Sequence, residues 1–257
     1  MSNSFALDPA AAWPAKPAVP SGAQLLAMAA GPSVEGTLHA KLAALHAERV
    51  RTWSTADLAD NIGQRQRLVA RFRPGQTLQP GQAVTPFSLT DTAGGLLHLA
   101  NLVAKGPAVF IFFRFAGCPA CNIALPHYRD TLAPALASLG VPLVAVSPQV
   151  PERLREIHTR HALPFAVASD LDNVVARRLG ILFSYDEKAR EASRRKGQFI
   201  GDVTATATWE LPMPIAIVLD QHCRLRFIDA SPDWLVRTES GPIIQAVRQA
   251  LDHPDPA

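Results

Sequence analysis

The sequence has few cysteines, little net charge and no long hydrophobic run. Three cysteines among 257 residues are too few for the disulfide framework of a secreted domain, so we expect a reducing compartment, with the cytoplasm as the location. A net charge of +3 is too small to indicate a nucleic-acid partner. The apolar stretch at residues 25–30 is too short for a membrane span, and residues 1–8 lack the basic residues that open a signal peptide. We therefore expect no nucleic-acid partner and no membrane partner.

Hydrophobic residues make up 48% of the chain, which is enough for one sizeable core with an appendage. The appendage precedes the turn-rich residues 73–81: residues 1–33 are rich in alanine and proline, and residues 34–72 have helical periodicity. We predict an N-terminal arm and helical extension at residues 1–75 and one domain at residues 76–257. The helices are expected to pack on that domain or on another subunit, so a homodimer is a further expectation.

Strands and helices alternate along the domain. This order predicts a three-layer α/β/α sandwich. The expected strands are residues 84–89, 96–99, 107–113, 141–147, 165–168, 215–219 and 225–228, and the expected helices are residues 118–139, 152–161, 171–179 and 241–251. Residues 186–196 predict a short charged helix whose Arg194-Arg195-Lys196 cluster forms a solvated face, or alternatively steers an acidic partner.

The most informative motif is Gly117-Cys118-Pro119-Ala120-Cys121, which directly follows the apolar strand at 107–113. A strand that ends in Cys-x-x-Cys and continues into a helix is typical of a thioredoxin-like redox site. Pro119 suits the first helical turn, and Pro134 is expected to kink the helix farther on.

Position at a helix N-terminus changes the chemistry of Cys118. The unpaired amides and the helix dipole favour the thiolate, which is the form that attacks peroxides and disulfides. We expect Cys118 to be the exposed cap residue, because attack requires access from solvent. Cys121 lies one turn farther on the same face, so it is expected to close an intramolecular disulfide after Cys118 has reacted.

Other interpretations of the cysteines are weaker. A zinc site needs four ligands, and no second Cys/His pair with suitable spacing is present, so we predict no metal and no cofactor. Two buried, inert cysteines would not require the strand-Cys-Pro-x-Cys-helix context. Cys223 lies in a turn between two strands, where a structural role is more plausible than a role as a second resolving thiol.

A proline precedes the strand at 215–219. Thioredoxin-like folds place a cis-proline there, opposite the Cys-x-x-Cys, and an X–Pro bond reaches the cis form at modest cost. We predict that Pro214 is this residue and that it contributes to the catalytic site, with Pro212 as the alternative and an ordinary trans proline as the other interpretation.

Taken in order, these segments resemble the peroxiredoxin-like branch of the alkyl hydroperoxide reductase/thiol-specific antioxidant family, within the thioredoxin-like superfamily. The resemblance covers about residues 78–251, and its segments are residues 84–94, 112–122, 144–149, 165–170 and 209–214. It implies an antioxidant oxidoreductase: Cys118 reduces a peroxide, Cys121 condenses with the sulfenic acid, and a thioredoxin- or glutaredoxin-type donor reduces the disulfide.

The chain departs from this family at two positions. Phe115 stands where typical members have a threonine three residues before the attacking cysteine, and no arginine is found near Pro214. Arg114 is the candidate to substitute for that arginine, and Glu210 is either a proton acceptor for Cys121 or a salt-bridged glutamate. A disulfide reductase without peroxidase activity and a redox-sensing binding module therefore remain alternative functions.

Overall fold

Strand β3 (Ala108–Phe112) is an interior strand of the sheet and leads to the Cys-x-x-Cys motif. All five of its residues are buried, as expected for a strand that helices cover on both sides. Its side chains alternate between two cores: Val109 and Ile111 pack in one layer, whereas Phe110 and Phe112 pack in the other. The computed structural model describes residues 36–252, and the predicted arm at 1–33 lies outside them.

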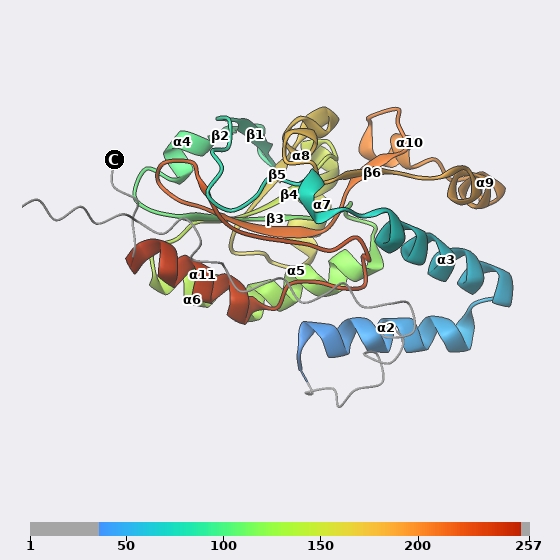
Figure 1. Ribbon diagram of the computed structural model, residues 1–257. Helices are drawn as coiled ribbons and strands as arrows, with labels where there is room; N and C mark the ends of the chain where they lie inside the picture. The colour runs from blue at the N-terminus through green and yellow to red at the C-terminus, as the bar shows by residue number, and fades with distance from the viewer. Residues whose placement is uncertain (1–35, 253–257) are drawn as a thin grey trace, which may run out of the picture. The chain divides into compact units, whose positions relative to one another are not determined.

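A seven-stranded mixed sheet organises these residues, in the order β2-β1-β5-β4-β3-β8-β9 (Figure 1). Strands β3, β4 and β5 are parallel, and β8 is antiparallel to β3, with Ile215 opposite Phe112 and Leu219 opposite Ala108. The other bounds are β1 (Ser88–Asp91), β2 (Leu96–His98), β4 (Leu143–Ser147), β5 (Ala166–Ser169), β8 (Ile215–Leu219) and β9 (Leu225–Ala230).

Helices cover both faces of the sheet, which confirms the predicted three-layer sandwich. One layer contains α2 (Leu38–Thr52), α5 (Pro119–Thr131), α6 (Ala133–Ser138), α7 (Pro151–Arg160) and α11 (Ser240–Asp252). The other contains α4 (Leu99–Leu102) and α8 (Val174–Arg178), with the short turns η1 (Pro74–Gln76) and η2 (Leu171–Asn173). No helix within residues 36–252 is both long enough and apolar enough to cross a membrane.

The predicted kink at Pro134 is confirmed. Helix α5 ends at Thr131, and α6 begins at Ala133 with Pro134 in its first turn. Proline fits a first turn because the missing N–H has no partner there in any case.

The segment at 182–212 contains more structure than the sequence indicated. The predicted charged helix is α9 (Glu187–Arg195), but a two-stranded sheet of β6 (Leu182–Ser184) and β7 (Glu210–Pro212) and the helix α10 (Ile200–Thr204) were not predicted. Basic residues of the cluster form ion pairs with the helical extension: Arg195 contacts Asp60 at 2.8 Å and Lys196 contacts Asp57 at 2.5 Å.

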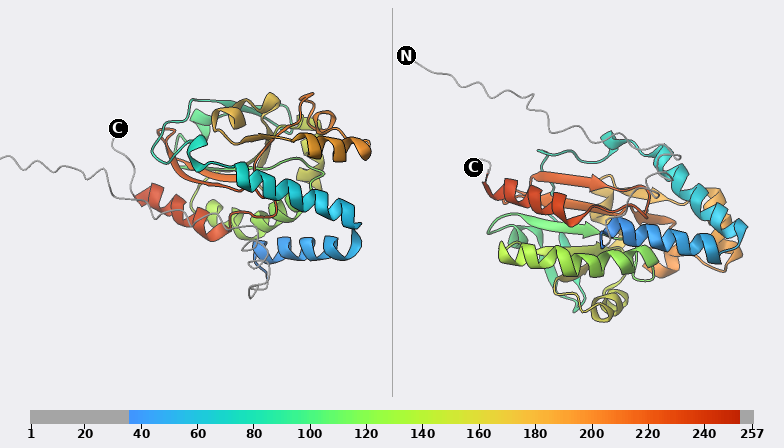
Figure 2. Two further views of the ribbon diagram at one scale, coloured as in Figure 1. Left: turned by 45° about the vertical axis from the view of Figure 1, so that its right-hand side comes forward. Right: turned by 90° about the horizontal axis from the view of Figure 1, so that it is seen from below.

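The N-terminal extension is a helical hairpin of α2 and α3 (Thr55–Arg71) that packs on the domain itself. Ser54 accepts a hydrogen bond from the Asp57 amide and caps α3. Helix α2 lies beside α5, where Leu38 and Leu42 join the core that contains both cysteines (Figures 1 and 2). Glu239 accepts hydrogen bonds from the amides of Leu38 and His39 and thereby fixes the start of α2.

Candidate active site

Cys118 is the N-cap residue of α5, and Pro119 occupies the first turn, as the sequence predicts. The loop before the helix is held by two side chains, Asn122 of α5 itself and Gln149 from the segment after β4. The Asn122 side-chain amide donates to the carbonyls of Ala116 at 2.6 Å and Cys118 at 2.9 Å, and the Ala116 amide donates to Gln149 Oε1 at 2.6 Å. These bonds fix the position of the Cys118 sulfur relative to the helix.

Both cysteines of the motif are free thiols, and their side chains are in hydrogen-bond contact. A hydrogen bond from the Cys121 side chain lowers the pKa of Cys118 to about 5; burial opposes this shift, and the charges of Arg114 and Arg237 add to it. Burial raises the pKa of Cys121, and its hydrogen bond to Cys118 raises it further. At neutral pH the pair therefore consists of one thiolate and one thiol, which is the arrangement needed for attack followed by resolution.

The expectation that Cys118 is exposed is wrong, because only 1% of its surface is accessible. The sulfur belongs to a core that contains Leu42 of α2 and Trp234 and Leu235 from the loop after β9. The sequence motif describes only the strand and helix that position the cysteine, whereas the covering residues come from segments distant in the chain.

Arg114 lies beside the cysteines and is itself buried, with 6% of its surface accessible. Its guanidinium donates to the Tyr185 hydroxyl at 2.8 Å and stacks 4.3 Å from the centre of the Trp234 ring. Burial acts to lower the pKa of Arg114, but Tyr185, Cys118 and Cys121 together raise it. Arg114 is therefore a fixed cation beside the Cys118 thiolate.

Arg237 is a second cation at this site, which the sequence analysis missed. Its Nη2 lies 3.9 Å from Cys121 Sγ, and its charge favours both thiolates. An arginine was expected close to Pro214 in the sequence, whereas Arg237 follows β9. Strand β9 returns antiparallel to β8, so the Ser231 amide donates to the Pro214 carbonyl and the following loop reaches the cysteines. Because Arg237 and Cys121 are far apart in the sequence, the sequence did not indicate that they are close in the structure.

Pro214 lies near the cysteines, but the prediction that its peptide bond is cis is wrong. Among residues 36–252 every peptide bond is trans. Met213 and Pro214 alone connect β7 to β8, and trans is the lower-energy isomer of an X–Pro bond by about 0.5–1 kcal/mol. Pro214 lines a small void of about 10 Å³ together with Cys121, Arg237 and Thr238.

Two other candidates lie away from the sulfurs. Glu210 forms an ion pair with Arg177 at 2.6 Å, and a hydrogen bond from Arg177 lowers the pKa of Glu210, so the salt-bridged interpretation is the correct one. Cys223 lies in the turn after β8, at the Ala108 end of β3, whereas Cys118 follows the Phe112 end. Cys223 and the motif therefore lie beyond opposite ends of the same strands.

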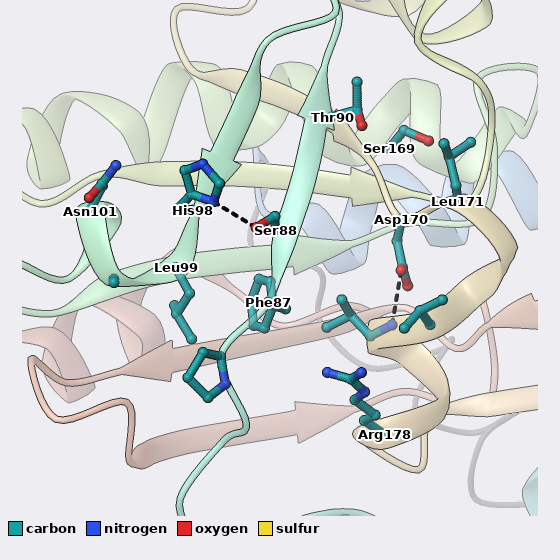
Figure 3. Close-up of a pocket in the computed structure, with 14 residues that line it drawn as sticks. Phe87, Ser88, Thr90, His98, Leu99, Asn101, Ser169, Asp170, Leu171 and Arg178 are labelled. Atoms are coloured by element: carbon teal, nitrogen blue, oxygen red, sulfur yellow. Dashed lines mark hydrogen bonds between the residues drawn. The ribbon is translucent and has the colours of Figure 1, made fainter.

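A larger hollow, of about 670 Å³, lies in the other layer between β1, β2 and α8 (Figure 3). Its wall includes His98, which contacts the Ser88 hydroxyl at 2.7 Å, and Asp170, which accepts from the Val175 amide at 2.9 Å. Neither cysteine of the motif borders this hollow, and neither does Arg114 or Pro214.

Comparisons with known proteins place the chain in a family. Residues 80–228 match the AhpC/TSA family. A Mycobacterium tuberculosis protein named as a peroxiredoxin is 31% identical over 111 residues, which are 43% of this chain and 68% of that protein. Peroxiredoxin Bcp of Escherichia coli is 28% identical over 104 residues, which are 40% of this chain and 65% of Bcp.

Solved structures show the same fold at low sequence identity. The peroxidoxin BcpB of Mycobacterium tuberculosis aligns with a TM-score of 0.52 at 19% identity and covers 67% of this chain and 97% of its own. A peroxiredoxin-like protein from Aquifex aeolicus aligns with a TM-score of 0.53 at 14% identity, over 68% and 88% of the two chains. The matched span begins before β1, ends within β9 and includes the whole Cys-x-x-Cys segment. The chain is therefore a member of the AhpC/TSA family with a thioredoxin-like fold.

Proposed function

We propose that this oxidoreductase reduces peroxides, with Cys118 as the attacking thiolate and Cys121 as the resolving thiol. The observation that carries the proposal is the position of Cys118 at the N-cap of α5, hydrogen-bonded to Cys121 and with a pKa of about 5, inside the segment that matches the family. Such a sulfur is ionised at neutral pH and is a strong nucleophile.

The proposed reaction has two steps on the protein. The Cys118 thiolate attacks the terminal peroxide oxygen, the O–O bond breaks, and the alkoxide leaves and takes up a proton. Cys118 is then a sulfenic acid. The Cys121 sulfur attacks the Cys118 sulfur, an S–S bond forms, and the hydroxyl group leaves with the proton of Cys121 as water. A dithiol donor of the thioredoxin or glutaredoxin type supplies two electrons and two protons and restores both thiols.

Two arginines support these steps in the proposal. Arg114 stabilises the Cys118 thiolate and the negative charge that develops on the departing oxygen. Arg237, at 3.9 Å from Cys121 Sγ, favours ionisation of the resolving thiol against the effect of burial. Pro214 lines the same small void as Cys121.

Burial of Cys118 imposes a condition on the cycle. A peroxide needs only a narrow opening, whereas a donor protein needs the Cys118–Cys121 disulfide to reach the surface, so a segment that covers the sulfurs must move. The three free thiols suit a reducing compartment, and we propose the cytoplasm.

A disulfide reductase without peroxidase activity is the second candidate, favoured by the same sulfur pair and by Phe115 in place of a threonine. Peroxide consumption with a thioredoxin system separates the two functions. Cys118→Ser should abolish turnover, because a hydroxyl at neutral pH is a far weaker nucleophile. Cys121→Ser should undergo one oxidation and then stop with a sulfenic acid on Cys118. Reduction of disulfides without peroxide consumption would instead establish the second candidate.

A further inference from the structure

Helix α2 brings Arg49 to the level of Cys118. The helix runs antiparallel to α5 (Figures 1 and 2), and Lys41 Nζ lies 3.4 Å from His127 Nδ1. At a rise of about 1.5 Å per residue, Arg49 lies about 12 Å from Lys41 along α2, and Cys118 lies about 13 Å from His127 in the same direction along α5. Arg49 precedes the family-matched residues 80–228, so the extension supplies this group.

Arg49 is a buried cation, although it lies on a helix that otherwise has many exposed positions. Only 6% of its surface is accessible, and its Nη1 atom has no hydrogen-bond partner. The guanidinium carbon lies 4.8 Å from the centre of the Trp53 ring, which gives one face an aromatic neighbour but no anion. A buried guanidinium donor without an acceptor is costly, and an anion bound beside it would satisfy that donor.

The positively charged groups around Cys118 outnumber the negatively charged ones. Burial lowers the pKa of Arg49, and Cys118 is the charged neighbour that most opposes this shift, with Arg114 also acting on the same group. Arg65 contributes a further guanidinium, but Asp233 pairs with it at 3.0 Å. Within residues 36–252 neither Arg49 nor Arg114 has a carboxylate at ion-pair distance, and the nearby Glu48 is exposed.

Arg49, Arg114 and Arg237 therefore all act on the single Cys118 thiolate, and the first two are buried guanidiniums without a carboxylate partner. Arg114 also has a buried Nε atom without a partner. Once Cys118 becomes a sulfenic acid or a disulfide, even the thiolate charge is lost. A neutral peroxide cannot compensate two cations, whereas a carboxylate can, and the planar guanidinium is suited to bind it through two parallel hydrogen bonds.

We propose that Arg49 and Arg114 bind a carboxylate of the substrate, so that the preferred substrates are small hydroperoxides with a carboxylate close to the peroxide group. This inference rests on the proposed peroxidase function and names its substrate class. It makes the N-terminal hairpin a part of the substrate site.

The test compares substrates that differ in charge but share a skeleton. One is tert-butyl hydroperoxide, the second has a carboxylate in place of one methyl group, and the third is the methyl ester of the second. The rate constant for oxidation of Cys118 is measured for each with the full chain. We expect the carboxylate to react roughly tenfold faster than its ester, which corresponds to about 1.4 kcal/mol of selective binding in the transition state.

Arg49→Met should lower the ratio well below tenfold, because Arg114 alone then remains to bind the carboxylate. Arg51→Met is the matched control, because Arg51 lies on the same helix but is exposed, and it should keep the full preference. Arg49→Lys keeps the positive charge but not the planar guanidinium that binds a carboxylate through two hydrogen bonds, so it should keep part of the preference. If Arg49→Met does not fold, Arg49→Lys replaces it as the test.

The outcomes separate the two proposals. Equal rates for the acid and the ester in the natural protein, or an unchanged preference in Arg49→Met and Arg49→Lys, would overturn the substrate class while leaving peroxidase function intact. Failure of all three compounds and of hydrogen peroxide to oxidise Cys118 would overturn the proposed function, and the substrate class with it. Slower alkylation of Cys118 in the presence of the matching hydroxy acid, seen in the natural protein but not in Arg49→Met, would support the carboxylate site without any peroxide.

Discussion

At the residue scale, the contact between Cys118 and Cys121 shifts their pKa values in opposite directions: it lowers the pKa of Cys118 and raises that of Cys121. The hydrogen bond between them stabilises negative charge on Cys118, and burial disfavours a second charge on Cys121. Two interacting thiols release their protons in two separate steps, so one of them is ionised over a wide range of pH.

This pair predicts the pH dependence of the peroxide reaction. The pKa of Cys118 is lowered to about 5, so its thiolate forms as the pH rises through that value. The rate constant for oxidation should fall about tenfold per pH unit below pH 5 and should be constant above about pH 6. Stopped-flow oxidation and ultraviolet absorbance of the thiolate measure the two profiles, with Cys118→Ser as the blank. A midpoint near 8.5, the value of a free cysteine, would contradict the assignment.

The sequence indicated the two sulfurs but not the groups that surround them. Cys118 and Cys121 could be predicted because a strand, a Cys-Pro-x-Cys segment and a helix are contiguous in the chain. Arg237 and Arg49 could not be predicted, because they reach the site only through the return of β9 and the docking of α2. The burial of Cys118 was missed for the same reason.

At the element scale, the α2–α3 hairpin acts as a cover over the site. Partly buried ion pairs hold it to two separate regions: Arg65 contacts Asp233 in the loop after β9, and Arg67 contacts Asp186 at 2.6 Å, at the start of α9. Because Trp234 follows Asp233 and packs in the same core as Cys118, the first of these pairs lies closest to the sulfur.

Loss of that pair should make Cys118 more accessible. Arg65→Met leaves Asp233 without its cation, so transient opening of the hairpin becomes more frequent. Alkylation of Cys118 by iodoacetamide should accelerate about tenfold for every 1.4 kcal/mol by which opening becomes easier. Arg71→Met is the control on the same helix. Arg71 is exposed, and its ion pair with Asp186 is long, at 3.7 Å, and therefore weaker. If both variants react at the natural rate, the hairpin does not limit access.

Elements with strong local signals were predictable, and elements that depend on tertiary contacts were not. The buried strands β3, β4 and β8 are continuous apolar runs, and Ser54 and Pro134 mark helix boundaries through their own chemistry. The β6–β7 pair joins segments about 26 residues apart, and neither strand has an alternating pattern that would reveal it.

At the scale of the whole molecule, the sheet keeps the third cysteine away from the other two. Cys223 follows β8 at the end opposite to Cys118, and a strand of five residues spans about 16 Å. Oxidation should therefore be confined to the Cys-x-x-Cys pair.

Treatment with one equivalent of peroxide should give an intramolecular disulfide and no covalent dimer, and Cys223→Ser should turn over at the natural rate. Non-reducing electrophoresis and peptide mapping measure the first result, and steady-state peroxide consumption measures the second. A disulfide that contains Cys223, or a large loss of turnover in Cys223→Ser, would show that the sheet rearranges during the cycle. The boundary at residues 75/76 and the homodimer stay predictions, and the mass of the native protein in solution is the measurement for the second.

The pairing of Arg65 with Asp233 has a consequence for the design of shortened variants. These two residues lie on opposite sides of the family-matched span at 80–228, as do Leu38 and Glu239, which are also in contact. The two flanks thus depend on each other and not only on the segment between them. A chain shortened to the shared span would lose both the α2–α3 hairpin and α11, and its reactive sulfur would be exposed. The reactivity of such a fragment would therefore be that of a solvent-exposed thiol and would not represent the enzyme.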